Sequence, residues 1–407
     1  MKTNSYAKAP IPAHVPPELV VDFDFWQLKN DTDDPFEHFT QLLVDGIPRI
    51  FWTPRNSGHW VFCRHEDIVV GLGDWERFSS SPGGIPARVG GPAQMIPVEL
   101  DPPEHQRVRA VLAPKFSPAA IQAMKSDIRK RAADLIDRFA ALGHCDFMTD
   151  FAGHLPTGIF LDLMGLPQQQ LPQFMLWEEM AMRGTDQKRK ELGYDLIYRY
   201  LNDFIVRKRE NLGEDDIAGT LLRYRDREGH PFSHDEVVAC CNLLYMAGLD
   251  TVMNTLGFIF RYLSSNAGAR QIILRHPEQL QAIVEEFTRV FGVPAQTRRV
   301  REDMAFRDIE MKSGDPVLLP TMLANRDDAI YLKSDVLDFS REPKKVLTFG
   351  AGPHRCLGVH LAKIELAIAI EEWFKRIPEF TLDPSEEITY VTGHTLGIHN
   401  LPLRWDA

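Results

Sequence analysis

Apolar residues recur at three- and four-residue spacing along most of the chain, a pattern typical of amphipathic helices packed on a core. Helices are predicted at residues 35–43, 117–141, 147–163, 171–183, 190–210, 214–225, 277–291 and 358–377. Pro156 is expected to break or kink the third of these helices. The pattern as a whole predicts a mainly α fold.

The longest apolar pattern runs from Val237 to about Leu263. Ser233 and Glu236 match a capping box at its start. A helix of about thirty residues at 1.5 Å per residue spans roughly 45 Å, enough to cross a whole domain. Because the helix is apolar on nearly every face as far as Asp250, we expect it to be buried.

A small amount of β structure and two irregular segments complete the pattern. Strands are predicted at 49–53 and 59–63, paired as a hairpin, and at 316–319 and 388–392. Residues 81–97 are dense in Gly and Pro, which indicates a long loop of the kind that binds ligands. Four prolines within residues 1–18 predict an extended N-terminal arm.

The amino-acid composition argues against several classes of protein. The 407 residues are 44% hydrophobic, and length alone suggests two or three domains. Lys and Arg total 46 against 57 Asp and Glu, and this acidic balance argues against nucleic acid as a partner. Five cysteines are too few and of the wrong parity for a disulfide framework. We found no apolar leader and no uncharged run of membrane-spanning length, so a cytoplasmic protein without a membrane segment is expected.

One cysteine stands in an unusual setting, although a single Cys is most often an inert core residue. Gly352 and Gly358 on either side of Cys356 leave room for a large flat group to approach the backbone. Cys356 immediately precedes a predicted helix, whose N–H groups and dipole favour a thiolate. A thiolate with such donors suits an iron ligand. His354 and Arg355 add potential positive charge beside it.

The segment from Phe349 to Gly358 resembles the haem-binding loop of the cytochrome P450 family: Phe, two residues, Gly, one, His, one, Cys, one, Gly. The resemblance covers essentially the whole chain and is closest to the bacterial camphor 5-monooxygenase subfamily. It implies one P450 domain over residues 1–407, with a helical body and a small β-rich region. Haem b would lie between the long central helix and the helix after the cysteine, with Cys356 as its axial metal ligand.

The sequence Ala-Gly-Leu-Asp250-Thr251 lies in the middle of the long helix. A mid-helix Gly costs about 1 kcal/mol relative to Ala, and an acid beside a hydroxyl in apolar surroundings needs partners. The residues alone leave a bent helix with a solvated acid equally open. The resemblance implies instead the family's acid–alcohol pair, in which Thr251 steadies the dioxygen being activated and Asp250 gates proton delivery. By the same similarity Arg183 would salt-bridge Asp250, and a surface Arg at a helix end stays an alternative.

The resemblance also implies residues that hold the cofactor and the fold. The cofactor-binding set consists of Cys356, His105, Arg109, Arg298, His354, Phe349, Gly352 and Gly358. His105 and Arg109 are four apart on one predicted helical face, and Arg suits the propionate carboxylates. The choice between Arg298 and Arg299 is open, and a solvent-facing charge is the alternative for each Arg. Glu286 and Arg289, with Arg341 from a later segment, are expected to lock the fold.

The predicted substrate pocket departs from the camphor enzyme. Residues 91–97 hold no Tyr to donate a hydrogen bond to the camphor ketone, so camphor itself is a doubtful substrate. By similarity the pocket residues are Ile85, Ala93, Gln94, Met95, Leu243, Met246, Ala247, Pro294, Gln296, His394 and Thr395. This mainly apolar set suits a small terpenoid or norisoprenoid ketone or alcohol, with Gln94, Gln296 or His394 supplying the bond.

The expected function is a haem-thiolate monooxygenase that hydroxylates such a substrate with O₂. Electrons would come from a [2Fe-2S] ferredoxin and its NADH-dependent reductase. A basic docking patch for the ferredoxin would consist of Lys344, Lys345, Arg355, Lys363 and Arg109. The alternatives are a peroxide-driven haem-thiolate enzyme, a non-catalytic haem protein that binds or senses ligands, and a haem-free helical scaffold. Exact substrate, regioselectivity, redox partner and oligomeric state are left open.

Overall fold

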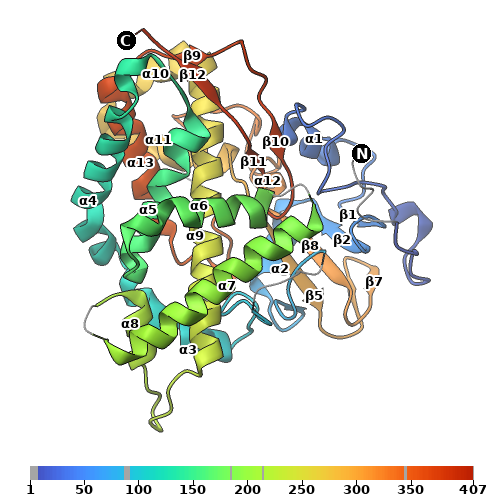
Figure 1. The fold of residues 1–407 in the computed structure, drawn as a ribbon. Helices are drawn as coiled ribbons and strands as arrows, with labels where there is room; N and C mark the ends of the chain where they lie inside the picture. The colour runs from blue at the N-terminus through green and yellow to red at the C-terminus, as the bar shows by residue number, and fades with distance from the viewer. Residues whose placement is uncertain (1–7, 87–91, 184–185, 213–214, 343–345, 407) are drawn as a thin grey trace. The chain divides into compact units, whose positions relative to one another are not determined.

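The computed structural model describes residues 8–86, 92–183, 186–212, 215–342 and 346–406. The chain groups into two compact units, each with its own apolar core (Figure 1). Unit 1 consists of Met1–Arg88, Ala282–Cys356 and Glu387–His399, and unit 2 of Val89–Gln281, Leu357–Glu386 and Asn400–Ala407. A single domain over residues 1–407 stays a prediction.

Unit 2 is mostly helical. Its α-helices are α3 (Glu104–Leu112), α4 (Pro118–Asp137), α5 (His154–Met164), α6 (Leu171–Glu178), α7 (Gln187–Glu210), α8 (Ile217–Arg223), α9 (His234–Ser265), α10 (Ala267–Arg275) and α13 (Val359–Arg376). A small antiparallel sheet joins β4 (His144–Asp146), β12 (Pro402–Arg404) and β9 (Thr381–Leu382) in that order. Helix α11 (Leu280–Val290) begins in unit 2 and continues into unit 1.

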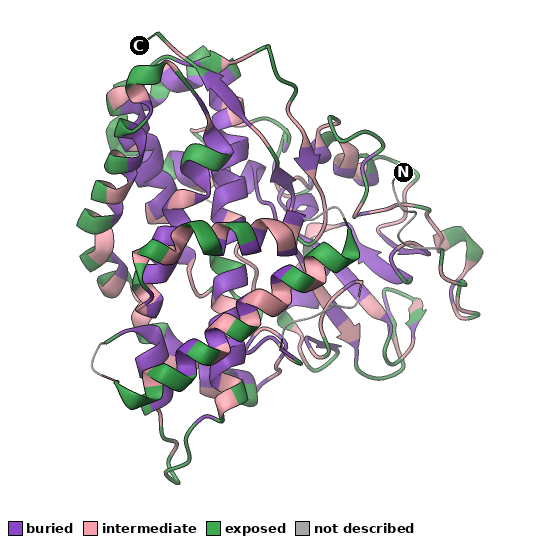
Figure 2. Ribbon diagram, in the orientation of Figure 1, coloured by how far each residue is buried: buried purple, intermediate pink, exposed green. Residues whose placement is uncertain are grey.

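Helix α9 is the core helix of unit 2. The predicted capping box is confirmed, because the Glu236 N–H donates to Ser233 Oγ (3.1 Å) and the Ser233 N–H donates to Glu236 Oε2 (2.7 Å). The helix packs against α5, α7, α8 and α13 and is buried over most of its length (Figure 2). Within the described ranges it alone has the length and hydropathy to cross a membrane, but 67% of its most apolar window is buried within the protein.

The predicted interruption at Pro156 lies earlier in the chain. Residues Met148–Ala152 form a π-helical turn, and α5 begins at His154 after Gly153. Pro156 is therefore in the first turn of α5, not at a break. A helix tolerates proline there because its first N–H groups have no intrahelical acceptor.

Unit 1 contains most of the β structure. Its five-stranded sheet has the order β1 (Ile50–Thr53), β2 (His59–Phe62), β8 (Pro316–Pro320), β5 (Ala295–Val300) and β3 (Phe78–Ser79). The predicted hairpin is confirmed by the antiparallel pairing of β1 and β2. Two smaller hairpins pair β6 (Met304–Phe306) with β7 (Ile309–Met311), and β10 (Tyr390–Val391) with β11 (Gly397–Ile398). The helices are α1 (Pro35–Thr40), α2 (His65–Gly73) and α12 (Thr321–Ala324).

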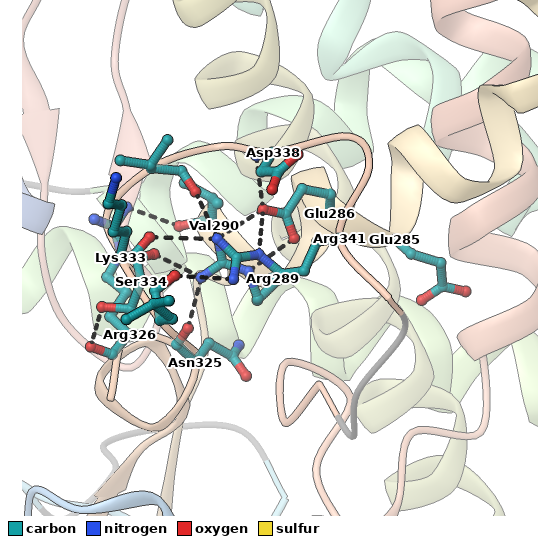
Figure 3. Close-up of polar contacts among 12 residues, drawn as sticks. Glu285, Glu286, Arg289, Val290, Asn325, Arg326, Lys333, Ser334, Asp338 and Arg341 are labelled. Carbon is teal, nitrogen blue, oxygen red and sulfur yellow. Dashed lines mark hydrogen bonds and ion pairs between the residues drawn. The ribbon is translucent and has the colours of Figure 1, made fainter. Parts of the chain in front are cut away.

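The predicted structural triad is assembled within unit 1 (Figure 3). Arg289 on α11 is 1% exposed and donates to both carboxylate oxygens of Glu286, at 2.8 and 2.7 Å. Arg341 donates to Glu286 Oε1 from a later segment at 3.2 Å. Arg289 also donates to the carbonyls of Asn325, Ser334 and Val336. One buried guanidinium thus holds the backbone at three points after α12.

Replacement of Arg289 by Gln is expected to lower the free energy of unfolding by about 3–5 kcal/mol, because it leaves the buried Glu286 carboxylate without its main partner. Urea denaturation of the two proteins measures the difference. Arg55→Gln is the control, since Arg55 pairs with Asp22 at the surface of the same unit, and about 1 kcal/mol or less is expected there. Equal losses in the two variants would contradict the structural role of Arg289.

Candidate functional site

The cysteine loop, which leads from Phe349 to Cys356 in unit 1, is closed by a backbone hydrogen bond and packs against α2. The Cys356 N–H donates to the Phe349 carbonyl at 2.8 Å. Gly352 has φ +66°, and a Cβ at that position would lie 2.8 Å from both the Gly73 Cα and the Leu72 carbonyl oxygen. Position 352 therefore requires glycine for its conformation and for the close approach to α2. The next helix, α13, begins directly after its N-cap residue Gly358.

Exposure separates Cys356 from the other cysteines. Cys356 is exposed, whereas Cys63, Cys145, Cys240 and Cys241 are all buried. Burial raises the pKa of the Cys63 thiol to about 12 and also raises the pKa of the other three thiols. These four side chains are protonated core residues, as predicted from the sequence. Cys356 is therefore the cysteine whose sulfur is available to a ligand.

The acid–alcohol segment of α9 lies in unit 2. Thr251 is half-buried, and its hydroxyl donates to the Ala247 carbonyl at 3.0 Å, in the back-bonding geometry expected from the sequence. Ala247 and Gly248 are exposed, and no atom lies within 4 Å of the position that a Cβ on Gly248 would take. The helix backbone is thus open to a ligand next to Thr251, although most of the helix is buried.

Asp250 is buried and held by partners, which excludes the alternative of a solvated acid. Its Oδ1 accepts a hydrogen bond from Asn254 Nδ2 at 2.8 Å and lies 3.5 Å from Arg183 Nη2. Arg183, which is buried at the end of the π-helical turn Glu179–Arg183, also donates to Asn254 Oδ1 at 2.9 Å. The predicted contact between Arg183 and Asp250 is present, and the alternative of a surface Arg is wrong.

A further acid at this site was not predicted from the sequence. Glu178, the last residue of α6, is buried, with its Oε1 4.0 Å from Arg183 Nε. Burial raises the pKa of Glu178 to about 8, and the nearby Asp250 charge acts in the same direction. The sequence offers no signal for it, because Glu178 and the half-buried Glu179 are adjacent acids in the same helical pattern.

A second unpredicted acid is Glu365 on α13, also in unit 2. Its side chain is buried, and burial raises its pKa to about 8. Among the described residues Glu365 Oε2 has no hydrogen-bond partner. Glu365 is therefore protonated at neutral pH.

The candidate propionate-binding residues divide between the two units. In unit 2, His105 is buried and Arg109 half-buried on the predicted helix α3. In unit 1, His354 Nε2 lies 3.0 Å from Ser80 Oγ, and Arg298 is buried on β5. Neither unit alone contains the whole set.

Strand β5 separates the two arginines that the sequence left as alternatives. Arg299 Nε donates to the Pro82 carbonyl and Arg299 Nη1 to the Gly314 carbonyl, both at 3.0 Å. Arg298 is one residue earlier and points to the opposite face of the strand. The guanidinium of Arg299 is therefore already engaged with backbone carbonyls.

The candidate pocket residues also form two groups. Unit 1 contributes Ile85, Pro294, Gln296, His394 and Thr395, and unit 2 contributes Ala93, Gln94, Met95, Leu243, Met246 and Ala247. In unit 1 the group is held together by a bridge between Pro294 and Thr395 and by the Ala295 N–H, which donates to the His394 carbonyl at 2.8 Å. In unit 2 the Met95 sulfur lies 3.4 Å from Asn242 Nδ2, next to Leu243 on α9.

Gln94 makes a contact within its own loop that the sequence did not indicate. Its amide nitrogen donates to the Glu99 carbonyl at 2.7 Å, and the Met95 N–H donates to Glu99 Oε2 at 2.7 Å. Both contacts close the 94–99 turn. One of the two amide N–H groups of Gln94 is thus used within the loop, and Gln94, Gln296 and His394 stay predicted donors to the substrate.

The predicted ferredoxin-docking patch is only partly visible. Lys344 and Lys345 lie outside the described residues. Arg355 is exposed in unit 1, whereas Arg109 and Lys363 are half-buried in unit 2. The patch stays a prediction.

Comparison with known proteins gives consistent matches. The family model "Cytochrome P450" matches residues 161–389. A probable cytochrome P450 127A1 of Sinorhizobium fredii is 32% identical and spans 100% of this chain and 98% of its own length. The mycinamicin IV hydroxylase/epoxidase of Micromonospora griseorubida is 30% identical over 86% of this chain and 91% of its own length.

Solved structures agree with these sequence matches. The crystal structures of CYP101J2 (TM-score 0.88) and CYP101C1 (TM-score 0.89) are each 30% identical and cover 98% of this chain and 100% of their own. Both belong to the CYP101 group, which is consistent with the resemblance to the camphor 5-monooxygenase subfamily. The expected mainly α fold with small sheets is confirmed.

Stability is expected to fall with rising pH through Glu365. Its pKa of about 8 in the folded chain lies above its ordinary value of 4.5, so its contribution is complete below pH 4.5 and is lost as pH rises through about 8. In this window it contributes a slope of up to about 1.4 kcal/mol per pH unit. Urea denaturation at several pH values should show a shallower decline in Glu365→Gln.

The exposed Glu386 of the same unit provides the control, and Glu386→Gln should retain the wild-type decline. The remaining decline in Glu365→Gln is expected because Glu178 titrates in the same range. An identical slope in wild type and Glu365→Gln would contradict the assignment.

Proposed function

The chain belongs to the cytochrome P450 family, and from this premise we propose that this monooxygenase hydroxylates a small hydrophobic terpenoid or norisoprenoid-like substrate. Haem b with a cysteine thiolate is the cofactor of the family. The observation that carries the proposal is the exposed Cys356 at the end of a glycine-closed loop, in a chain whose other four cysteines are buried.

The residues present fit this cofactor. Cys356 offers an accessible sulfur in unit 1, and a Cβ placed on Gly248 or Gly358 in unit 2 would have no atom within 4 Å. Open backbone of this kind admits a large flat group. When bound through Cys356, the haem would supply O₂ activation, which a thiolate ligand favours by pushing electron density toward O–O cleavage. The protein supplies binding, orientation and proton movement.

Four basic side chains are proposed to hold the propionates. They are His105, Arg109, Arg298 and His354. Arg298, whose Nη1 donates to the Thr297 carbonyl at 2.7 Å, is favoured because it points to the face of β5 opposite the one where Arg299 donates to two carbonyls. Phe349, Gly352 and Gly358 shape the cysteine loop around the cofactor. Ion pairing with propionates would also offset the burial of the Arg298 charge on β5.

Proton delivery is proposed to run through Asp250 and Thr251. The Thr251 hydroxyl is half-buried beside the exposed backbone of Ala247, so it is placed to donate to a bound ligand after leaving the Ala247 carbonyl. Asp250 is held on the buried side of the helix by Asn254 and Arg183. It moves a proton toward Thr251 only after its contact with Arg183 loosens.

The substrate class follows from the polar positions of the pocket. In unit 2 the candidate residues are apolar or, like Gln94, already bonded within their loop. In unit 1 Gln296 is half-buried and His394 is exposed, with the His394 ring edge-on to Trp26 at 5.4 Å. One or two polar contacts within an apolar site suit a terpenoid or norisoprenoid with a single ketone or alcohol.

Electrons are proposed to come from a [2Fe-2S] ferredoxin and its NADH-dependent reductase, in the cytoplasm. The likeness to the two CYP101 structures over nearly the full chain supports this choice. Basic residues near Cys356, such as Arg355, would attract an acidic partner in spite of the net charge of −11. Turnover with ferredoxin, compared with turnover on peroxide alone, separates this proposal from a peroxide-driven enzyme.

The haem-thiolate assignment is tested by the absorption spectrum of the reduced CO complex. Wild type is expected to show the red-shifted Soret band of thiolate ligation, and Cys356→Ser is expected to lose it. Cys63→Ser, at a buried cysteine of the same unit, should keep the band. A thiolate spectrum in Cys356→Ser, or none in wild type, would overturn the assignment.

Titration with small terpenoids and norisoprenoids, in which the haem spin state is monitored, then tests the substrate class.

Replacement of Thr251 by Val should lower the product formed per O₂ consumed by up to about tenfold, since a neutral hydrogen bond is worth about 0.5–1.5 kcal/mol. Ferredoxin-driven turnover with parallel O₂ and product measurements gives this ratio. Thr255 makes the same back-bond to Thr251, at 2.8 Å, one turn later at a buried position. Thr255→Val should therefore leave the ratio unchanged, and equal effects would point to a helix distortion instead.

A further inference from the structure

Three ionisable side chains are buried together beside α9. The side chains of Glu178, Arg183 and Asp250 are 8%, 7% and 6% exposed. Arg183 contacts both acids, with Nε 4.0 Å from Glu178 Oε1 and Nη2 3.5 Å from Asp250 Oδ1, and the two carboxyl groups also act on each other directly. Asn254 completes the group through its bonds to Arg183 and Asp250. One cation thus faces two carboxyl groups away from water.

The charges of this group do not balance unless one acid is protonated. Beyond Arg183 and Asp250, the groups that act on Glu178 are its neighbour Glu179 and the hydroxyl of Tyr245 on α9. The Tyr245 hydroxyl donates to the Phe174 carbonyl at 2.6 Å, so its proton is committed. In the described part of the chain, Arg183 is the one cation acting on Glu178. An unpaired buried carboxylate is costly, so the group holds one proton.

The partners of each acid indicate where that proton resides. Asp250 accepts from Asn254 and has the shorter distance to Arg183, which favours its ionised form. Glu178 Oε1 has no hydrogen-bond partner among the described residues, which favours the neutral form. Burial raises the pKa of Glu178 to about 8, in agreement with this assignment.

We propose that Glu178 is the proton store of the oxygen-activating site and acts through Asp250. The proton passes from the Glu178 carboxyl to the Asp250 carboxylate, and Arg183 exchanges its ion pair with Asp250 for one with Glu178. The net charge of the group is zero before and after the transfer. Asp250 becomes neutral and is released from Arg183 with the proton that it carries onward. The inference rests on the proposed function, because Asp250 is the gate there.

Infrared spectroscopy of the haem-loaded protein tests the store without turnover. A protonated carboxylic acid has a carbonyl stretch separate from that of carboxylates, and Glu178 and Glu365 should each give such a band at neutral pH. Glu178→Gln should lose one of these bands and Glu365→Gln the other. Glu179→Gln, at the half-buried neighbour that pairs with Arg189, should keep both. A Glu178→Gln spectrum with both bands would overturn the proposal.

Asp250→Asn gives a second, independent test. With Asp250 neutral, Glu178 is left as the single acid beside Arg183, so it should ionise and its band should disappear although Glu178 itself is unchanged. A Glu178 band retained in this variant would show that the two acids do not share one proton, and that result would overturn the proposal.

Turnover connects the store to function. In wild type the product formed per O₂ should fall as pH rises through about 8, where Glu178 loses its proton. In Glu178→Gln the ratio should be low at all pH values, and Glu179→Gln should follow wild type. A Glu178→Gln profile identical to wild type would overturn the proposal. Loss of the thiolate Soret band in wild type would instead refute the haem-thiolate function, which separates the two failures.

Discussion

The burial of the Arg289 guanidinium is the constraint on which the cysteine-loop unit depends. Its donors go to Glu286 and to three backbone carbonyls of the 325–336 segment, and its face lies 5.1 Å from the Tyr331 ring. The acceptors at Asn325 and Ser334 are buried with the guanidinium, so losing them would leave a buried charge without partners. The backbone from Asn325 to Val336 is therefore tied to this one side chain. The same unit contains the cysteine loop.

The second buried guanidinium, that of Arg183, makes longer contacts with its acids than Arg289 makes with Glu286. Arg289 contacts its acid through two hydrogen bonds of 2.7 and 2.8 Å, whereas Arg183 lies 3.5 and 4.0 Å from its two acids. Short paired bonds to one partner resist exchange, and longer contacts to two competing partners permit it. One unit thus uses a buried arginine to fix the backbone, and the other holds one in an arrangement that can switch. The proposed proton gate requires the second kind.

Sequence reasoning succeeded where local pattern decides the structure. The capping box at Ser233, the hairpin of residues 50–62 and the glycine positions of the cysteine loop depend on neighbouring residues, and the structure contains all three. Sequence reasoning failed where packing against a distant element decides whether a side chain is buried. Only the packing of α6 on the rest of unit 2 distinguishes buried Glu178 from half-buried Glu179. The hydrogen bond of Gln94 within its own loop was not predicted, because its acceptor is a backbone carbonyl and no sequence pattern indicates such a contact.

Strand β5 shows how a segment with no apolar alternation can still be informative. It was not predicted, since its sequence Ala-Gln-Thr-Arg-Arg-Val lacks the period-two pattern of a half-buried strand. Thr297 accepts from the Gly84 N–H and Arg299 donates to the Pro82 carbonyl, so one face of the strand holds the 82–84 loop. Successive side chains alternate between faces, which places Gln296 and Arg298 together on the other face. The proposed function is consistent with this arrangement. It places a candidate substrate-orienting amide and a proposed propionate-binding guanidinium on the same face of one strand, while the opposite face contacts the 82–84 loop.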